Sequence, residues 1–168
     1  MTETCSDNDA KQLRPGIWQT VNERYPGVMI TKDDLVPLAR LAKPLSECRL
    51  TFVSTAGVQP KGSVPFDTVH PVGDYSFRRV PSDSRVADLE IHQLKYPTIG
   101  AKKDLNVIFP IERLQEIAKD GLIGELAPNF FSFIGYNMDA EMLEPSLAEN
   151  MADAVEAEGS DVALLAPA

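Results

Sequence analysis

The sequence predicts an α/β fold of three layers with a mostly parallel sheet. Apolar runs rich in β-formers alternate with helical periodicity in the order strand, helix, strand, helix, strand, which is typical of Rossmann-like or flavodoxin-like domains. The 168 residues suffice for one domain with a sizeable core. The last run, 161–168, is short and apolar, so we expect a fully buried, central strand. No loop or helix follows it, so we expect the fold to be incomplete at its C-terminus.

Two parts are expected along the chain: an N-terminal arm with one helix over residues 1–46, and the α/β domain over residues 47–168. The first 13 residues are polar, charged and without periodicity, which is typical of a disordered tail. An apolar stripe follows Asp34, a good N-cap, and Pro44 ends that helix.

The strands and helices of the domain follow from residue type and spacing. In chain order they are expected at strand 50–55, strand 77–80, strand 89–92, helix 111–120, strand 129–134 and helix 145–158. Pro110 suits the first turn of one helix, and Gly159 the end of the other. The Gly- and Pro-rich segment 56–75 is predicted to be a long irregular loop, and such loops are often functional.

Charge excludes some partners and suggests others. With 16 basic and 25 acidic residues the net charge is −9, which disfavours nucleic-acid binding. After Lys119 there is no Lys or Arg, while ten acidic residues follow. This asymmetry indicates either a solvated acidic face or a surface that meets a basic partner or segment. No apolar run reaches the roughly 20 residues of a membrane span, and the N-terminus is no signal peptide, so we expect a cytoplasmic protein without a membrane partner.

Neither a nucleotide site nor a metal site is predicted. Ala56 and Gly57 follow the first strand without a GxGxxG or P-loop pattern. The two histidines, His70 and His92, do not combine with the two cysteines at the spacing of a zinc site. Cys48 precedes a strand with no nearby base in sequence, so no catalytic thiol is expected within the chain.

Three stretches carry side chains suited to chemistry, each with a structural alternative. His92 ends a predicted strand, where it suits acid–base work or a hydrogen-bonded structural role. Asp74 and Arg78 lie in GDYSFRR, which suits either recognition of a small carboxylate or a capped turn with a surface ion pair. Asn106 lies in DLNVIFP, where it either caps a turn or holds a ligand near a helix start.

Several stretches together resemble a known family. They are, in order, VSTAGV (53–58), PFD (65–67), GDYSFRRVP (73–81), His92, DLNVIFPIERL (104–114), GLIGELA (121–127) and SDVALLAPA (160–168). In combination they resemble the selenoprotein B family of the glycine, sarcosine, betaine and D-proline reductases. The resemblance covers about 120 residues.

The resemblance implies a component of an oxidoreductase that cleaves a C–N bond reductively. In that family a redox-active selenocysteine or cysteine follows the last strand, so the nucleophile is expected beyond Ala168, at a UGA codon. A pyruvoyl group on a partner subunit and a thioredoxin-like electron donor are implied as well. No cofactor is expected within these residues.

The resemblance and the strand-end placement together predict a pocket. Its members are Ser54, Asp74, Arg78, His92 and Asn106. Arg78 is expected to bind the substrate carboxylate, and His92 to transfer a proton.

Two other functions stay open. One is a non-catalytic scaffold or binding subunit that uses the acidic face and the arm. The other is a thiol or selenol oxidoreductase of the same fold with another substrate. We also expect an apolar patch beside the C-terminus and a tendency to form homo-oligomers.

Overall fold

The structure is a computed structural model that describes residues 20, 23–26, 39–94, 97–137 and 139–168. The chain separates into two compact units, Met1–Leu38 and Ala39–Ala168, and the second contains the sheet. Most of the predicted arm, with the first half of its helix, lies outside the described residues. Residues 39–43, predicted as the end of that helix, form irregular and bent backbone instead.

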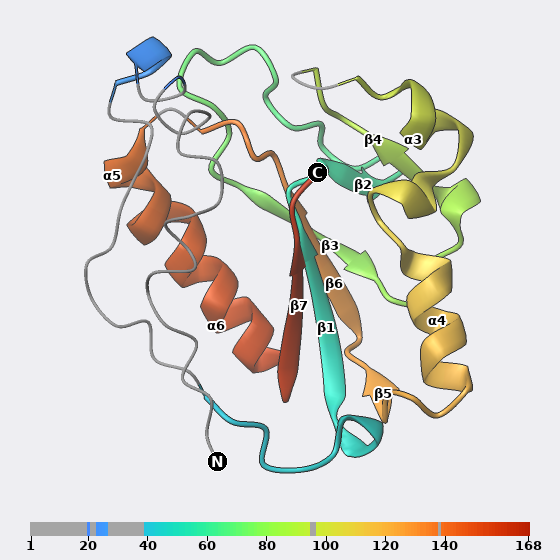
Figure 1. Ribbon diagram of the computed structural model, residues 1–168. Helices are drawn as coiled ribbons and strands as arrows, with labels where there is room; N and C mark the ends of the chain where they lie inside the picture. Colours follow the sequence, from blue (N-terminus) through green and yellow to red (C-terminus); the bar gives the residue numbers. More distant parts are fainter. Residues whose placement is uncertain (1–19, 21–22, 27–38, 95–96, 138) are drawn as a thin grey trace. The chain divides into compact units, whose positions relative to one another are not determined.

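A mostly parallel sheet forms the middle layer of the second unit, as predicted (Figure 1). Its strands are β1 (Arg49–Ser54), β3 (Phe77–Pro81), β5 (Glu125–Leu126), β6 (Asn129–Phe133) and β7 (Val162–Ala166). β1 pairs in parallel with β5, β6 and β7, whereas β3 runs antiparallel to β6. β1 is therefore the strand around which the sheet is built.

Helices cover both faces of this sheet (Figure 1). On one side lies α4 (Ile111–Lys119), and on the other a continuous helical stretch of α5 (Ala140–Leu143), a π-helical turn (Glu144–Ala148) and α6 (Glu149–Ala157). The helix predicted for 145–158 thus begins earlier. The π turn contains Pro145, and a proline has no N–H to donate inside a helix, so the regular hydrogen-bond pattern is interrupted there.

Alternate residues of β1 supply the two cores. Phe52 packs edge-to-face on Phe109 and Phe130, with ring centroids 5.1 and 5.9 Å away, in the core under α4. The next residue, Val53, points to the opposite face and joins Met151 in the core under α6. One strand therefore anchors both helical layers.

A second, antiparallel sheet lies beside the first. It pairs β2 (Val58–Pro60) with β4 (Leu89–Ile91), so the segment 56–75 is not wholly irregular as predicted. Short helical turns complete the fold: Leu45–Glu47, Val86–Asp88, α3 (Ile99–Lys103) and Leu105–Val107.

The prediction of a buried central strand at 161–168 is wrong in its placement. β7 forms there, but among the described strands it pairs with β1 alone and lies at the edge of the sheet. Leu164 is 42% exposed and Leu165 71% exposed. An apolar run predicts burial only where neighbours cover both faces, and no described element covers the outer side of β7.

Replacement of Phe109 by Ala tests the aromatic core. Phe109 is fully buried against two other rings, so we expect the free energy of unfolding to fall by about 3–5 kcal/mol in urea denaturation. The control is Val107→Ala two residues earlier, where the side chain is exposed and the change should stay within about 0.5 kcal/mol. Equal effects of the two substitutions would contradict this packing.

Candidate functional site

The carboxyl ends of β1 and β6 meet at a tight backbone junction. The amide of Gly57 donates to the carbonyl of Phe133 at 2.9 Å, and the amide of His92 donates to the carbonyl of Gly57 at 2.8 Å. Gly57 has φ +64°, and a Cβ there would lie 2.6 Å from the His92 carbonyl oxygen. Only glycine permits this approach, which brings His92 to the carboxyl edge of the sheet.

Ser54, the last residue of β1, lies within this junction. Its side chain is 1% exposed, and its hydroxyl donates to the carbonyl of Ile108 at 3.3 Å and accepts from the amide of Ala56 at 3.2 Å. These bonds join β1 to the segment that leads into α4. A role of Ser54 in binding a substrate stays a prediction.

Thr55 holds the end of the described chain at the same edge. Its hydroxyl accepts from the amide of Ala168 at 2.8 Å. The amide of Gly135 donates to the Thr55 carbonyl at 3.3 Å, and a Cβ on Gly135 would lie only 2.9 Å from the Cβ of Thr55. Sequence reasoning missed both residues; the glycine directly after a strand was the one available signal.

Asp74 organises the loop before β3. One carboxylate oxygen accepts from the amide of Asp67 at 2.8 Å, and the other from the amide and the hydroxyl of Ser76. Burial acts to raise the pKa of Asp74, but these hydrogen bonds and the charge of Arg78 outweigh it, so the pKa lies below its ordinary value. Asp74 is therefore an ionised carboxylate at neutral pH.

Arg78 fixes the neighbouring loop. Its guanidinium donates to the carbonyls of Val64 at 3.0 Å and Pro65 at 3.3 Å, and to the Ser76 hydroxyl at 2.8 Å. It also stacks over the Phe66 ring, 4.1 Å from the centroid. Most of its donors thus bind the protein itself, and recognition of a substrate carboxylate by Arg78 stays a prediction.

His92 lies beside a carboxylate. Its Nε2 is 3.4 Å from Glu90 Oε1, which also accepts from the Gln59 amide at 3.0 Å. That amide lowers the pKa of Glu90, burial opposes the effect, and His92 lowers the pKa further. Glu90 orients the imidazole, which is partly exposed and therefore still open to solvent. This arrangement suits a proton donor or acceptor.

Asn106 has its contacts on the α4 side. Its side-chain oxygen accepts from the amide of Glu112 at 3.1 Å, and its amide group donates to Asp104 at 3.1 Å and Glu112 at 2.9 Å. Asn106 therefore caps the first turn of α4, the structural alternative for this motif.

The structure brings four of the five predicted residues to one edge of the sheet. β3 runs antiparallel to β6, so the loop of Asp74 and the first residues of β3, which include Arg78, lie at the carboxyl end of β6, with Gly73 bridged to Asn137. A small cavity of about 10 Å³ lies there, and the prediction missed its polar residues. Its lining residues are Asp67, Thr68, His70, Gly73, Gln93, Ile134 and Tyr136.

The described residues hold no cluster of three or more His, Cys, Asp or Glu side chains arranged for a metal ion. None of the described helices is long and apolar enough to cross a membrane. Cys48 is fully buried, and its thiol donates to the carbonyls of Lys43 and Pro44.

Fold and site define a class of protein: a three-layer α/β domain whose polar loops gather at the carboxyl edge of a mostly parallel sheet. A sequence model of one family, described as glycine/sarcosine/betaine reductase selenoprotein B (GRDB), matches residues 21–168. Since this match covers most of the chain, the chain belongs to that family, and the resemblance inferred from its motifs is confirmed.

The similar curated proteins are longer than this chain. The D-proline reductase subunit gamma of Acetoanaerobium sticklandii is 32% identical over 125 residues, which cover 74% of this chain and 50% of that protein. The glycine reductase complex component B subunit gamma of Peptoclostridium acidaminophilum is 26% identical over 135 residues, 79% of this chain and 30% of that protein. The chain therefore spans half or less of the length of these relatives. No solved structure matches.

Arg78→Ala tests the role of the guanidinium in the loop. Loss of its hydrogen bonds and of its stacking on Phe66 should lower the free energy of unfolding by about 1–2 kcal/mol and speed hydrogen exchange at the amides of Phe66 and Asp67. The control Arg85→Ala removes an exposed ion pair with Asp88 and should change stability by less than about 0.5 kcal/mol. Unchanged exchange in Arg78→Ala would show that the loop is held by other contacts.

The lowered pKa of Asp74 predicts that the stability of the fold depends on pH. Because its folded-state pKa is lowered, its contribution is fully present above the unfolded value of about 3.9 and is lost as the pH falls through the folded value. Asp74→Asn should therefore lower the urea midpoint at pH 7 and leave it unchanged near pH 2. A difference that persists at the lower pH would contradict the ionic role.

Proposed function

We propose that this chain is part of the nucleophile-bearing subunit of an amino-acid reductase complex that cleaves a C–N bond reductively. The substrate class is that of the family: glycine, sarcosine, betaine or D-proline. One observation carries the proposal: the backbone amide of Ala168 donates a hydrogen bond to the Thr55 hydroxyl at the carboxyl edge of β1. The same turn holds His92, whose amide donates to the Gly57 carbonyl. Active sites of open α/β sheets lie at this edge.

A selenol or thiol attached directly after Ala168 fits this edge. Such a group would supply a low-pKa nucleophile for attack on the carbon that bears the amine. The only described thiol, that of Cys48, is buried beside the amino end of β1 and is unsuited to the task. The nucleophile is therefore proposed to lie beyond these residues, at a UGA codon or a cysteine codon.

The chain's own residues would position the substrate and protonate the departing amine. His92, oriented by Glu90 and partly exposed, is the proposed proton donor to the departing amine. Asp74 and Arg78 hold the loop that forms one wall of the site, with Asp67 and Ser76 as their partners. Asn106 and Ser54 hold the segment before α4 against β1.

The proposed partners follow from the same function. A subunit with a pyruvoyl group would supply the carbonyl that activates the amine, and a thioredoxin-like dithiol protein would supply two electrons. The related proteins are named as subunits of the D-proline reductase and of the glycine reductase complex, which supports a multi-subunit assembly. Such a selenol-dependent assembly belongs in the reducing cytoplasm.

The proposal is tested with the gene's reading frame continued through the codon after Ala168. Expressed with selenium and the pyruvoyl-bearing subunit, it should incorporate selenium where that codon is UGA. With either codon it should oxidise dithiothreitol only when one of the four substrates is present. His92→Gln should lower kcat at least about 100-fold, whereas the exposed Asp88→Asn should leave it unchanged. A TAA or TAG codon at that place, or turnover by residues 1–168 alone, would contradict the proposal.

A further inference from the structure

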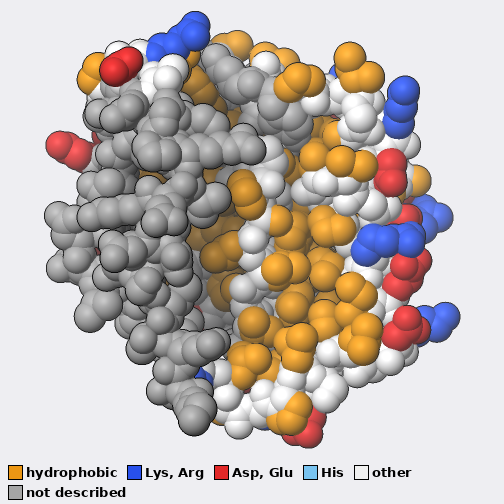
Figure 2. Space-filling view, in the orientation of Figure 1, with side chains coloured by type: hydrophobic (Ala, Val, Ile, Leu, Met, Phe, Trp, Pro, Cys, Tyr) orange, Lys and Arg blue, Asp and Glu red, His pale blue; other side chains and the backbone are white. Residues whose placement is uncertain are grey.

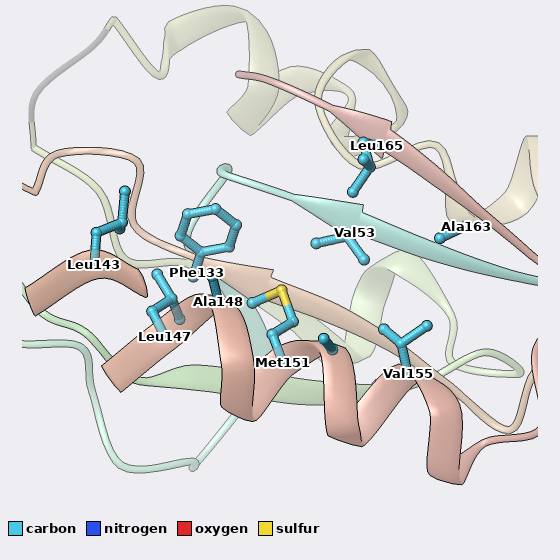
Figure 3. Close-up of a pocket in the computed structure, with 10 residues that line it drawn as sticks. Val53, Phe133, Leu143, Leu147, Ala148, Met151, Val155, Ala163 and Leu165 are labelled. Carbon is cyan, nitrogen blue, oxygen red and sulfur yellow. The ribbon is translucent and has the colours of Figure 1, made fainter. Parts of the chain in front are cut away.

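The side chains around the larger sheet are mainly suited to packing. Hydrophobic side chains gather on the face of the molecule that Figure 2 shows. The groove between α6 and the sheet has a volume of about 440 Å³ and only apolar lining side chains, among them Val53, Met151 and Leu165 (Figure 3). Such a lining offers no group that could hold or transfer a proton. The small sheet of β2 and β4, in contrast, contains a row of polar side chains that contact one another.

This row consists of Gln59, Glu90 and His92. β2 and β4 run antiparallel and side by side, with Gln59 directly opposite Glu90, so the side chains of this pair point to the same face (Figure 1). His92 follows Glu90 by two residues, which returns its side chain to that face. The bond from the His92 amide to the Gly57 carbonyl continues the pairing of the two strands. The register therefore brings an amide, a carboxylate and an imidazole together.

Glu90 is the middle member of the row. Its Oε1 accepts from Gln59 Nε2 at 3.0 Å and lies 3.4 Å from His92 Nε2. The Gln59 amide lowers the pKa of Glu90 although burial opposes the effect, so the carboxylate is ionised and can only accept hydrogen bonds. In a neutral imidazole, the nitrogen that faces such an acceptor carries the proton, and the other nitrogen is left free to accept one.

Gln59 is fully buried, and its side chain is only partly satisfied. Its Nε2 donates to Glu90 and, at 3.4 Å, to the carbonyl of Ser63, whereas its Oε1 has no hydrogen-bond partner among the described residues. A buried acceptor without a donor destabilises a fold, and an apolar side chain of similar size would avoid this effect. Packing alone therefore does not explain a glutamine here, whereas its bond to Glu90 does.

We propose that Gln59 is a positioning residue, which holds Glu90 so that His92 keeps one proton on Nε2 and presents Nδ1 to the substrate. The inference rests on the proposed function, in which His92 protonates the departing amine. In that step the Nδ1–H bond breaks and a new N–H bond forms on the amine, which leaves with both electrons of the C–N bond. The ring becomes neutral and still donates its Nε2 proton to Glu90.

The first test is an NMR measurement on the full chain and requires no turnover. The chain has two histidines, which the variant His70→Gln tells apart. With both rings labelled with nitrogen-15 at about pH 9, where imidazoles are neutral, His92 should show a proton on Nε2 alone. The exposed His70 should show both nitrogens averaged between the two tautomers. A proton on Nδ1 of His92, or nitrogen shifts equal to those of His70, would overturn the proposal.

Substitution of Gln59 tests its part in this arrangement. Gln59→Met and Gln59→Leu remove the amide and keep an apolar side chain of similar size. In each, the His92 nitrogen shifts should move at least about halfway toward those of His70. The matched control is Gln115→Met, which also removes two hydrogen bonds from a side-chain amide to backbone carbonyls and should leave the His92 shifts unchanged. Unchanged shifts in the two Gln59 variants would overturn the proposal.

A double-variant comparison tests whether Gln59 acts through Glu90. Glu90→Ala should shift the His92 nitrogens as Gln59→Met does, and Gln59→Met should add no further shift in that background. A further shift of similar size would show that Gln59 affects His92 by another route.

Turnover in the assembled reductase provides the second readout. Gln59→Met should lower kcat about tenfold and change KM less than twofold, because it disturbs proton transfer rather than substrate binding, and Gln115→Met should keep both values. Full turnover of Gln59→Met would overturn the positioning role. Absence of turnover in the unsubstituted assembly would count against the proposed function instead, and the NMR spectra would still decide whether Gln59 positions His92.

Discussion

The parallel pairing of β7 with β1 is the interaction that brings the end of the described chain to the site. Its register runs from Leu50 opposite Val162 to Ser54 opposite Ala166, which brings Ala168 to the Thr55 side chain. Asp161 fixes the start of this register, since its carboxylate accepts from the Arg49 amide at 2.7 Å and pairs with Lys43. The bond from Arg49 and the charge of Lys43 lower the pKa of Asp161. A slip by one residue would turn every side chain of β7 to the opposite face.

The carboxyl edge of the sheet is held mostly by backbone contacts and by polar side chains that form hydrogen bonds with the backbone. Gly57 and Gly135 let His92 and Thr55 approach closely, while Asp74 and Arg78 tie down the loop in front of β3. Asp74 and Arg78 therefore hold the loop in place, and they are distinct from the side chains that could act on a ligand. The His92 side chain is 30% exposed and has Glu90 as its orienting partner.

Much of the fold could be predicted from local sequence, because β1, β6 and α4 combine strong residue preferences with clear periodicity. The short elements β2, β5 and α3 could not, since their sequences carry no clear periodicity and pairing and packing fix them instead. The burial of β7 was predicted wrongly because exposure depends on neighbours that an apolar run does not reveal. For the site, motif spacing predicted His92, Asp74 and Arg78, whose roles stay predictions, but the Thr55–Gly135 contact exists only in three dimensions.

The central claim is that β7 pairs with β1 in the register that brings Ala168 to Thr55. The most direct measurement is a nuclear Overhauser spectrum of the isotopically labelled chain. We predict cross-peaks between the Thr55 methyl and the Ala168 amide proton, and cross-strand contacts between β1 and β7 in the register of Phe52 with Leu164. Cross-strand contacts shifted by one residue, or β7 amides that exchange at the rate of an unfolded peptide, would contradict it.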